Sequence, residues 1–226
     1  MDYSREFCTL VNNLQRKYGK WQIWNDFLLL SATSLVNSFP SEKRDSREEA
    51  YLQTIRRYTK EEQETFITLF SYVVLALEEN PKQDFLGTLY HRLNLQQEQK
   101  GQFFTPYHIS ELMAELNFNE TAKTPIENRG YLTVNDPTCG SGAMLIAFSN
   151  VCLQHHINHQ QKVLFFAQDI DWTAAMMCYI QLSLLGCNAF VIIGDSLLHP
   201  GFHPDNDVFI TPMLYLNQWR FPEYFT

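Results

Sequence analysis

The chain has 226 residues, with 17 Lys and Arg against 25 Asp and Glu and a formal net charge of −8 at pH 7. Because 45% of the residues are hydrophobic and 14% aromatic, the composition excludes an intrinsically disordered chain and allows one large domain or two small ones. The five cysteines form no CxxC pair, and no segment resembles a signal peptide or a membrane span, so we expect a cytoplasmic protein with reduced thiols.

The charge is distributed unevenly along the chain. Residues 1–100 hold 13 Lys and Arg against 14 Asp and Glu, whereas residues 101–226 hold 4 against 11. Proteins that bind nucleic acid unaided usually present a basic face, because phosphate contacts supply most of the non-specific affinity. If this chain acts on DNA, we therefore expect a partner to supply much of the DNA-binding affinity.

Apolar residues recur at helical spacing in the first part of the chain, in the segments 7–14, 21–39, 58–77 and 84–95. The charged stretch "PSEKRDSREEA" (40–50) predicts a loop, and "QQEQKGQ" (96–102) predicts a polar linker. We therefore predict a helical N-terminal domain over residues 1–99.

From Tyr131 onward the apolar pattern changes. Short β-type runs stand at 131–135, 162–168, 189–194 and 208–211. Helical patterns separate the first three runs, and Gly186 is placed to end the second helix. Alternating strands and helices predict parallel pairing with right-handed crossovers, so residues 100–226 should form an α/β, Rossmann-like domain with a truncated parallel sheet.

A glycine turn, "DPTCGSG", follows the first predicted strand. Asp136 ends that strand, and Gly140 and Gly142 allow a tight turn and close approach of a ligand. A dinucleotide site would need a third glycine where Leu145 stands. An acid-led turn suits a positively charged ligand, such as S-adenosylmethionine, better than a pyrophosphate. The alternative is a tight turn that binds nothing.

Two more carboxylates stand at strand ends. Asp169 follows the second strand, where an acid accepts hydrogen bonds from both ribose hydroxyls of an adenosine. Asp195 follows the third strand and could accept from an adenine amino group. We predict no metal site, because no acidic or cysteine ligand accompanies the histidine groups at 155–159 and 199–203 at zinc spacing.

The segment "GQFFTPYHISELMAEL" followed by "NDPTCGSGAML" resembles the methylation subunit of type I restriction–modification systems, the adenine-specific DNA methyltransferases. "DFLGTLYHRL", "AQDID" and "GDSLL" extend the resemblance over residues 84–213. It implies an S-adenosylmethionine cofactor, a DNA substrate and a specificity subunit or other partner. The cofactor residues that it implies are Thr105, Pro106, Asp136, Pro137, Gly140, Ser141, Gly142, Asp169 and Asp195.

The "TP" dipeptide also has a purely local interpretation. Thr105 as N-cap and Pro106 as the first helical residue would explain both residues without a ligand. The two interpretations are compatible, because a capping residue can also border a cofactor.

The catalytic motif of that family is Asn-Pro-Pro followed by an aromatic residue, at the end of strand four. There the Asn oxygen and a proline carbonyl accept hydrogens from the flipped-out adenine amine. This chain has "DVFITPML" instead, so either Ile210 or Thr211 replaces the Asn, depending on which proline Pro212 matches. The candidate catalytic residues are Thr211, Pro212 and Tyr215. Losing an acceptor tuned to the transition state typically costs on the order of 10²–10³ in rate.

Two hypotheses remain. The first is an adenine-specific (N6) DNA methyltransferase that needs partner subunits for DNA recognition. The second is a catalytically degenerate scaffold or regulatory module that still binds S-adenosylmethionine. In either, the apolar fourth strand needs cover from the aromatic C-terminal tail, from the N-terminal helices or from another subunit, including a second copy of the chain.

Overall fold

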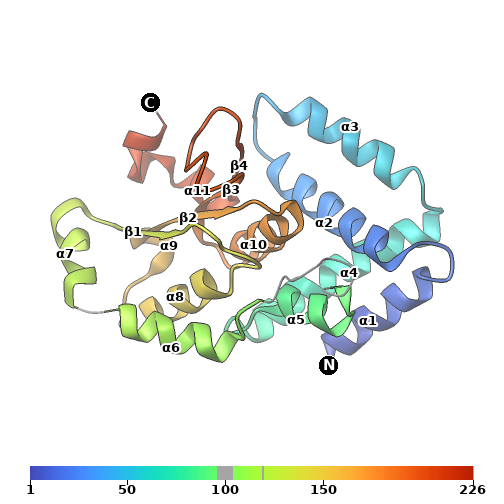
Figure 1. The fold of residues 1–226 in the computed structure, drawn as a ribbon, viewed down its shortest axis with the longest axis horizontal. Coiled ribbons are helices and arrows are strands. Elements are labelled where there is room, and N and C mark those ends of the chain that lie inside the picture. The colour runs from blue at the N-terminus through green and yellow to red at the C-terminus, as the bar shows by residue number, and fades with distance from the viewer. Residues whose placement is uncertain (96–103, 119, 226) are drawn as a thin grey trace.

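The computed structural model describes residues 1–95, 104–118 and 120–225 (Figure 1). The first part of the chain is helical: α1 (Tyr3–Leu14), α2 (Lys20–Val36), α3 (Arg44–Ile55), α4 (Lys60–Glu79) and α5 (Phe85–Arg92). The helices predicted there are confirmed. The linker predicted at 96–102, and with it the boundary proposed between residues 99 and 100, lies outside the described residues.

Helix α3 corrects the loop predicted over residues 40–50. Its sequence, "RDSREEAYLQTI", has almost no apolar face, and Thr54 is its one fully buried residue. Arg, Glu, Ala and Gln are nevertheless strong helix formers, and Asp45 lies in the first turn, where a negative charge favours the helix dipole. Intrinsic propensity, together with a few contacts to the rest of the protein from Arg47, Tyr51 and Ile55, therefore stabilises this helix, and neither contribution leaves a periodic signal.

The second part alternates helices and strands: α6 (Tyr107–Asn117), α7 (Glu120–Arg129), β1 (Leu132–Asp136), α8 (Ala143–Gln154), α9 (His159–Lys162), β2 (Val163–Asp169), α10 (Trp172–Leu184), β3 (Asn188–Ile193), β4 (Asp207–Ile210), α11 (Pro212–Leu216), η2 (Gln218–Arg220) and η3 (Pro222–Tyr224). All four predicted strands are confirmed, and Gly186 follows α10 with φ = +68°. Helix α6 begins one residue later than expected, because Pro106 rather than Thr105 occupies the N-cap.

The four strands form one sheet in the order β1-β2-β3-β4. Strands β1, β2 and β3 are parallel, as predicted. Strand β4 runs antiparallel to β3, with Phe190 opposite Ile210 and Ile193 opposite Asp207, which corrects the fully parallel sheet. A parallel neighbour would need a crossover, usually a helix, whereas residues 194–206 contain no helix and simply return the chain along β3.

The outer edge and one face of the sheet are covered by different segments. Arg47 of α3 lies at β4, where its Nη2 atom donates to the carbonyl oxygen of Val208 and to Asp207 Oδ1, at 3.3 Å each. The aromatic tail packs instead on a sheet face, in a buried cluster that comprises Tyr131, Leu164, Phe190, Ile192, Leu214 and Phe221. The N-terminal helices and the tail thus both provide the cover expected for β4.

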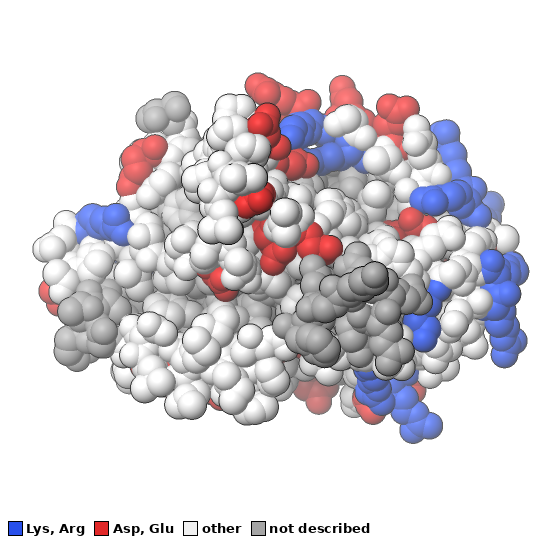
Figure 2. All heavy atoms as spheres, viewed as in Figure 1, with Lys and Arg blue, Asp and Glu red and all other residues white. Residues whose placement is uncertain are grey.

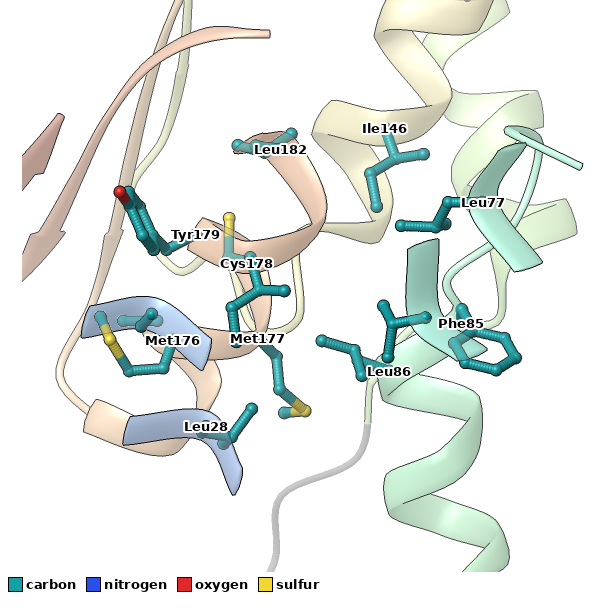
Figure 3. Packing of buried hydrophobic residues seen from close by; sticks show 14 of the residues in the cluster. Leu28, Leu77, Phe85, Leu86, Ile146, Met176, Met177, Cys178, Tyr179 and Leu182 are labelled. Carbon is teal, nitrogen blue, oxygen red and sulfur yellow. The ribbon is translucent and has the colours of Figure 1, made fainter. Parts of the chain in front are cut away.

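Helix α10 lies between the helical part and the sheet. Every residue from Thr173 to Leu182 is buried. Figure 3 shows side chains of α10 surrounded by Leu28 of α2, Leu77 of α4, Leu86 of α5 and Ile146 of α8. One hydrophobic core, from Phe7 to Phe209, therefore joins the two predicted domains. None of the described helices is long and apolar enough to span a membrane.

Candidate functional site

The turn between β1 and α8 depends on two glycines. Gly140 has φ = +55° and Gly142 has φ = +94°, both in the left-handed region that L side chains rarely adopt. A Cβ atom on Gly142 would lie 2.9 Å from Cys178 Sγ, and one on Gly140 would lie 2.9 Å from the ring of Phe104. Their small size lets α10 and Phe104 approach the turn, so the glycines serve packing as well as conformation.

Two carboxylates lie at neighbouring strand ends beside this turn. Asp169, at the end of β2, accepts a hydrogen bond from the backbone N–H of Gly140 at 2.8 Å and from that of Asp171 at 2.9 Å. Asp136, at the end of β1, accepts from the N–H of Thr138 at 3.2 Å. Burial raises the pKa of both carboxyl groups, and the negative charge of Asp169 further raises the pKa of Asp136.

Both carboxylates border a cleft of about 860 Å³, which is within the usual range for small-molecule sites. Its polar end is formed by the glycine turn and the two acids. Its apolar wall comes from α6 and α8, and comprises Met113, Ala114, Met144, Leu145 and Phe148. A ligand that combines a cationic group and hydroxyls with a flat apolar ring fits this combination, because buried carboxylates are stabilised by a nearby positive charge.

The structure brings five of the nine predicted cofactor residues to this cleft: Thr105, Asp136, Gly140, Ser141 and Asp169. The other four, Pro106, Pro137, Gly142 and Asp195, do not line it. Asp195 serves a local turn, where its Oδ1 atom accepts from the N–H groups of Leu197 and Leu198 at 2.9 and 3.2 Å.

The structure does not bring the predicted catalytic residues to the cleft. Because β4 is antiparallel, its carboxyl end lies beside the start of β3, about 13 Å along the sheet from the strand ends that hold the acids. Thr211 is completely buried there, donating to the carbonyl of Cys187 at 2.7 Å and accepting from the N–H of Ala189 at 2.9 Å. Its hydroxyl bonds to the backbone at the start of β3, so Thr211 does not lie at the cofactor cleft as expected of a catalytic residue.

The other two predicted catalytic residues follow Thr211 away from the cleft. Pro212 is the first residue of α11, and the ring of Tyr215 lies 4.3 Å from that of Phe39. Proline at the first helical position has an ordinary structural role, because it has no N–H to satisfy there. Neither residue lines the cleft.

Sequence reasoning missed several buried polar residues around the site. Gln168 bonds to Gly194, His199 and Gly201, and Asn206 bonds to His199 and Gly201, so two amides hold the loop after β3. Asp84 and Gln181 contact the glycine turn itself. A lone buried amide leaves no periodic mark in a sequence. Asp84 stands directly before "FLGTLY", where an aspartate is expected as the N-cap of a helix. That role explains the residue locally, so the sequence gives no sign that Asp84 also contacts the glycine turn.

The histidines at 199 and 203 have an acidic neighbour that spacing did not reveal. Asp205 Oδ2 lies 3.9 Å from His199 Nε2 and 3.6 Å from His203 Nδ1. The two rings stack with their centroids 4.2 Å apart and an interplanar angle of 9°, so their ring-nitrogen lone pairs lie in two parallel planes. His203 Nδ1 also accepts the N–H of Asp205. Local turn bonding accounts for this group.

Charge divides the visible face of the molecule. In Figure 2, acidic side chains lie in the middle and along the top of the view, and most basic side chains lie at the right, over the helical part of the chain. This agrees with the sequence, in which residues 101–226 hold only 4 Lys and Arg.

Known proteins are similar to this chain in sequence. A sequence model of the N-6 DNA methylase family matches residues 82–223. The MjaVIII methylase subunit of a type I restriction enzyme from Methanocaldococcus jannaschii is 30% identical over 106 residues, which are 46% of this chain and 16% of that protein. The match thus covers about a sixth of the relative.

A crystal structure of a Listeria monocytogenes protein described as a class I S-adenosylmethionine-dependent methyltransferase aligns with 96% of this chain and 69% of that one, at 15% identity and a TM-score of 0.48. The family match spans the α5 segment, the glycine turn, both cleft acids and β4. S-adenosylmethionine is the cofactor that such a methylase requires, and the cleft has the acids, the glycine turn and the apolar wall to hold it. The chain belongs to the N-6 DNA methylase family.

Proposed function

We propose that this chain takes part in the methylation of adenine N6 in DNA, as the S-adenosylmethionine-binding component of a modification system of type I kind. The observation that supports it best is the cleft in which Asp136 and Asp169, at adjacent strand ends, face the glycine turn. The cofactor would supply an electrophilic methyl group. The chain's own residues would bind and orient it.

Roles for the cleft residues follow from their positions. Asp169 would accept hydrogen bonds from the ribose hydroxyls, because a carboxylate offers about four acceptor sites and backbone N–H groups fill only part of them. Asp136 would balance the positive charge of the methionine part. The apolar wall of α6 and α8 would receive the adenine ring. Thr105 would border the reacting end of the cleft.

DNA recognition would come from a partner. The visible acidic side chains and the shortage of Lys and Arg after residue 100 disfavour a duplex bound by this part of the chain alone. The relative in Methanocaldococcus jannaschii is a subunit by name, which supports the same interpretation. We place the complex in the cytoplasm, because its DNA substrate is found there and because the reducing conditions keep the five cysteines of this chain as free thiols.

A second function is favoured by one specific observation. The residues "ITPM", where the family motif was expected, lie at the edge of the sheet opposite the cleft, and Thr211 is sealed in the core. This observation supports a module that binds S-adenosylmethionine and regulates or scaffolds a complex without transferring the methyl group itself.

Two measurements separate these functions. Calorimetric titration with S-adenosylmethionine tests the shared cofactor claim, with Asp205→Asn as a control because that exposed acid lies outside the cleft. Transfer of labelled methyl groups to duplex DNA, with and without a candidate specificity subunit, tests catalysis. Binding without transfer in both conditions would favour the scaffold, and absence of binding would reject both functions.

A further inference from the structure

A buried carboxylate from the helical part of the chain contacts the glycine turn. Asp84 precedes α5, is only 5% exposed, and lies 57 residues before its partner in the turn. Its Oδ2 atom accepts a hydrogen bond from the hydroxyl of Ser141 at 2.5 Å. Its Oδ1 atom accepts from the N–H of Gly87 at 2.9 Å, which caps the helix.

Gln181 of α10 completes this network. Its Nε2 atom donates to Asp84 Oδ1 at 2.8 Å and to the carbonyl oxygen of Ser141 at 2.9 Å. Its Oε1 atom accepts from the N–H of Leu86 at 3.0 Å. Gln181 and Ser141 are 0% and 1% exposed. Three segments, namely the start of α5, the glycine turn and α10, are therefore joined by direct hydrogen bonds.

The fit leaves no spare room. A Cβ atom on Gly87 would lie 2.7 Å from Ser141 Oγ and would overlap Asp84 Oδ2. The glycine in "DFLG" is thus required by the same contact that uses its aspartate. A single network explains Asp84, Gly87, Ser141 and Gln181, which come from three separate segments of the sequence.

Burial of a carboxylate is unfavourable unless donors surround it. Burial raises the pKa of Asp84, and the donors Ser141, Gln181 and Gly87 act in the opposite direction. The cap alone would not require such burial, since exposed Asp residues cap helices equally well, as Asp2 does for α1. The buried contact to Ser141 is therefore the feature of Asp84 that needs a separate explanation.

We propose that Asp84 is a positioning residue for the cofactor site. It holds Ser141, and through it the turn from Gly140 to Gly142, at the polar end of the cleft that Ser141 lines. The α5 segment is thereby part of the cofactor site although it contributes no residue to the lining of the cleft. The proposal rests on S-adenosylmethionine as the ligand of that cleft.

The test compares Asp84→Asn, Ser141→Ala and the double variant with the wild-type chain. Asn is isosteric and can still accept from Gly87 and Gln181, but it has no charged acceptor for the Ser141 hydroxyl; its amide can only donate to that hydroxyl, which leaves a weaker, neutral contact in the reverse direction. The matched control is Asp26→Asn, since Asp26 is also a buried acid (6% exposed) of the helical part, bonded to Tyr58 and Arg57 and away from the turn.

Cofactor affinity is measured by calorimetry, and stability by urea denaturation. We expect Asp84→Asn to weaken S-adenosylmethionine binding on the order of tenfold, because a turn that is less firmly held populates its binding-competent conformation less often. Asp26→Asn should lower stability and leave the affinity unchanged. The effects of Asp84→Asn and Ser141→Ala on affinity should not add in the double variant, because both single changes act on the same contact.

The possible outcomes separate the two claims. A wild-type chain that binds no S-adenosylmethionine overturns the cofactor assignment and this proposal together. A wild-type chain that binds it, with Asp84→Asn at unchanged affinity, overturns this proposal alone. If Asp84→Asn does not fold, Ser141→Ala decides in its place, because it removes only the hydroxyl; unchanged affinity of that variant counts equally against the proposal.

Discussion

Asp169 and Gly140, 29 residues apart, are joined by a 2.8 Å hydrogen bond from the glycine N–H to the carboxylate. The bond ties the end of β2 to the turn that follows β1. An acid that would contact the cofactor thus also shapes the loop over it. Changing Asp169 should therefore lower the affinity for the cofactor in two ways: a contact to the ligand is lost, and the turn is held less firmly.

We predict that Asp169→Asn weakens S-adenosylmethionine binding about 10- to 100-fold, because a charged acceptor for two hydroxyls is replaced by a neutral one. Calorimetry on the purified chain measures the change. Asp205→Asn, an exposed acid outside the cleft, should bind as the wild type does. Equal affinities for the two variants would remove Asp169 from the site.

The raised pKa of Asp136 predicts a stability effect with a definite sign. Its folded pKa lies above the ordinary value of 3.8, so the folded state favours the protonated form. The associated stability is fully present below pH 3.8 and is lost as the pH rises through the folded pKa. Asp136→Asn should therefore raise the free energy of unfolding at pH 7.

That gain should shrink as the pH is lowered toward 3.8, and urea denaturation at several pH values measures it. The same substitution should weaken cofactor binding at pH 7, since it removes a charge from the cleft. A variant that is less stable than the wild type at pH 7 would show that the ionised form of Asp136 is not penalised by burial.

We predict that Gly142→Ala is markedly destabilising, for two reasons that a control separates. A positive φ costs an L residue roughly 1–2 kcal/mol. Gly130 has φ = +90° and nothing within 4 Å of the position that a Cβ atom would take, so Gly130→Ala measures that cost alone. Gly142→Ala adds a clash with Cys178 and should cost at least ~1 kcal/mol more. Equal free energies of unfolding would mean that α10 yields to the new methyl group.

Thr211 should behave as a structural residue. Thr211→Val leaves the N–H of Ala189 and the carbonyl of Cys187 without the hydroxyl that bonds them and should cost about 1–3 kcal/mol of stability. S-adenosylmethionine affinity should be unchanged. Thr211→Asn should give no gain in methyl transfer, because the side chain lies at the opposite edge of the sheet. A gain in labelled methyl incorporation would contradict the antiparallel direction of β4.

The elements that could be predicted from the sequence have a periodic or compositional signal. The run "AFVIIG" and the apolar helix α10 are buried on nearly every side, so their residues report their environment directly. Helix α3 has no such signal, because it packs through few side chains and depends largely on strong helix formers. The direction of β4 also has none, since the same "VFIT" would suit a parallel or an antiparallel neighbour.

The site divides in the same way. The acids and glycines of the cleft follow from strand ends, where parallel strands bring their carboxyl ends to one edge. Thr211 was expected at the same edge because β4 was assumed to be parallel to the other strands; since β4 is antiparallel, it ends at the other end of the sheet. Asp84 could not be identified as a neighbour of the turn, because contact across 57 residues depends on how α5 packs against α10.

The complete burial of α10 has a consequence for any attempt to divide the chain. Helices of the first part cover one side of it and the sheet covers the other. Expressed alone, residues 100–226 would leave that side of the helix in water, a continuous apolar surface of the kind that promotes aggregation. Folding of the described parts should accordingly be cooperative, with a single denaturation transition, and residues 1–95 should stay attached in any shortened version made for expression.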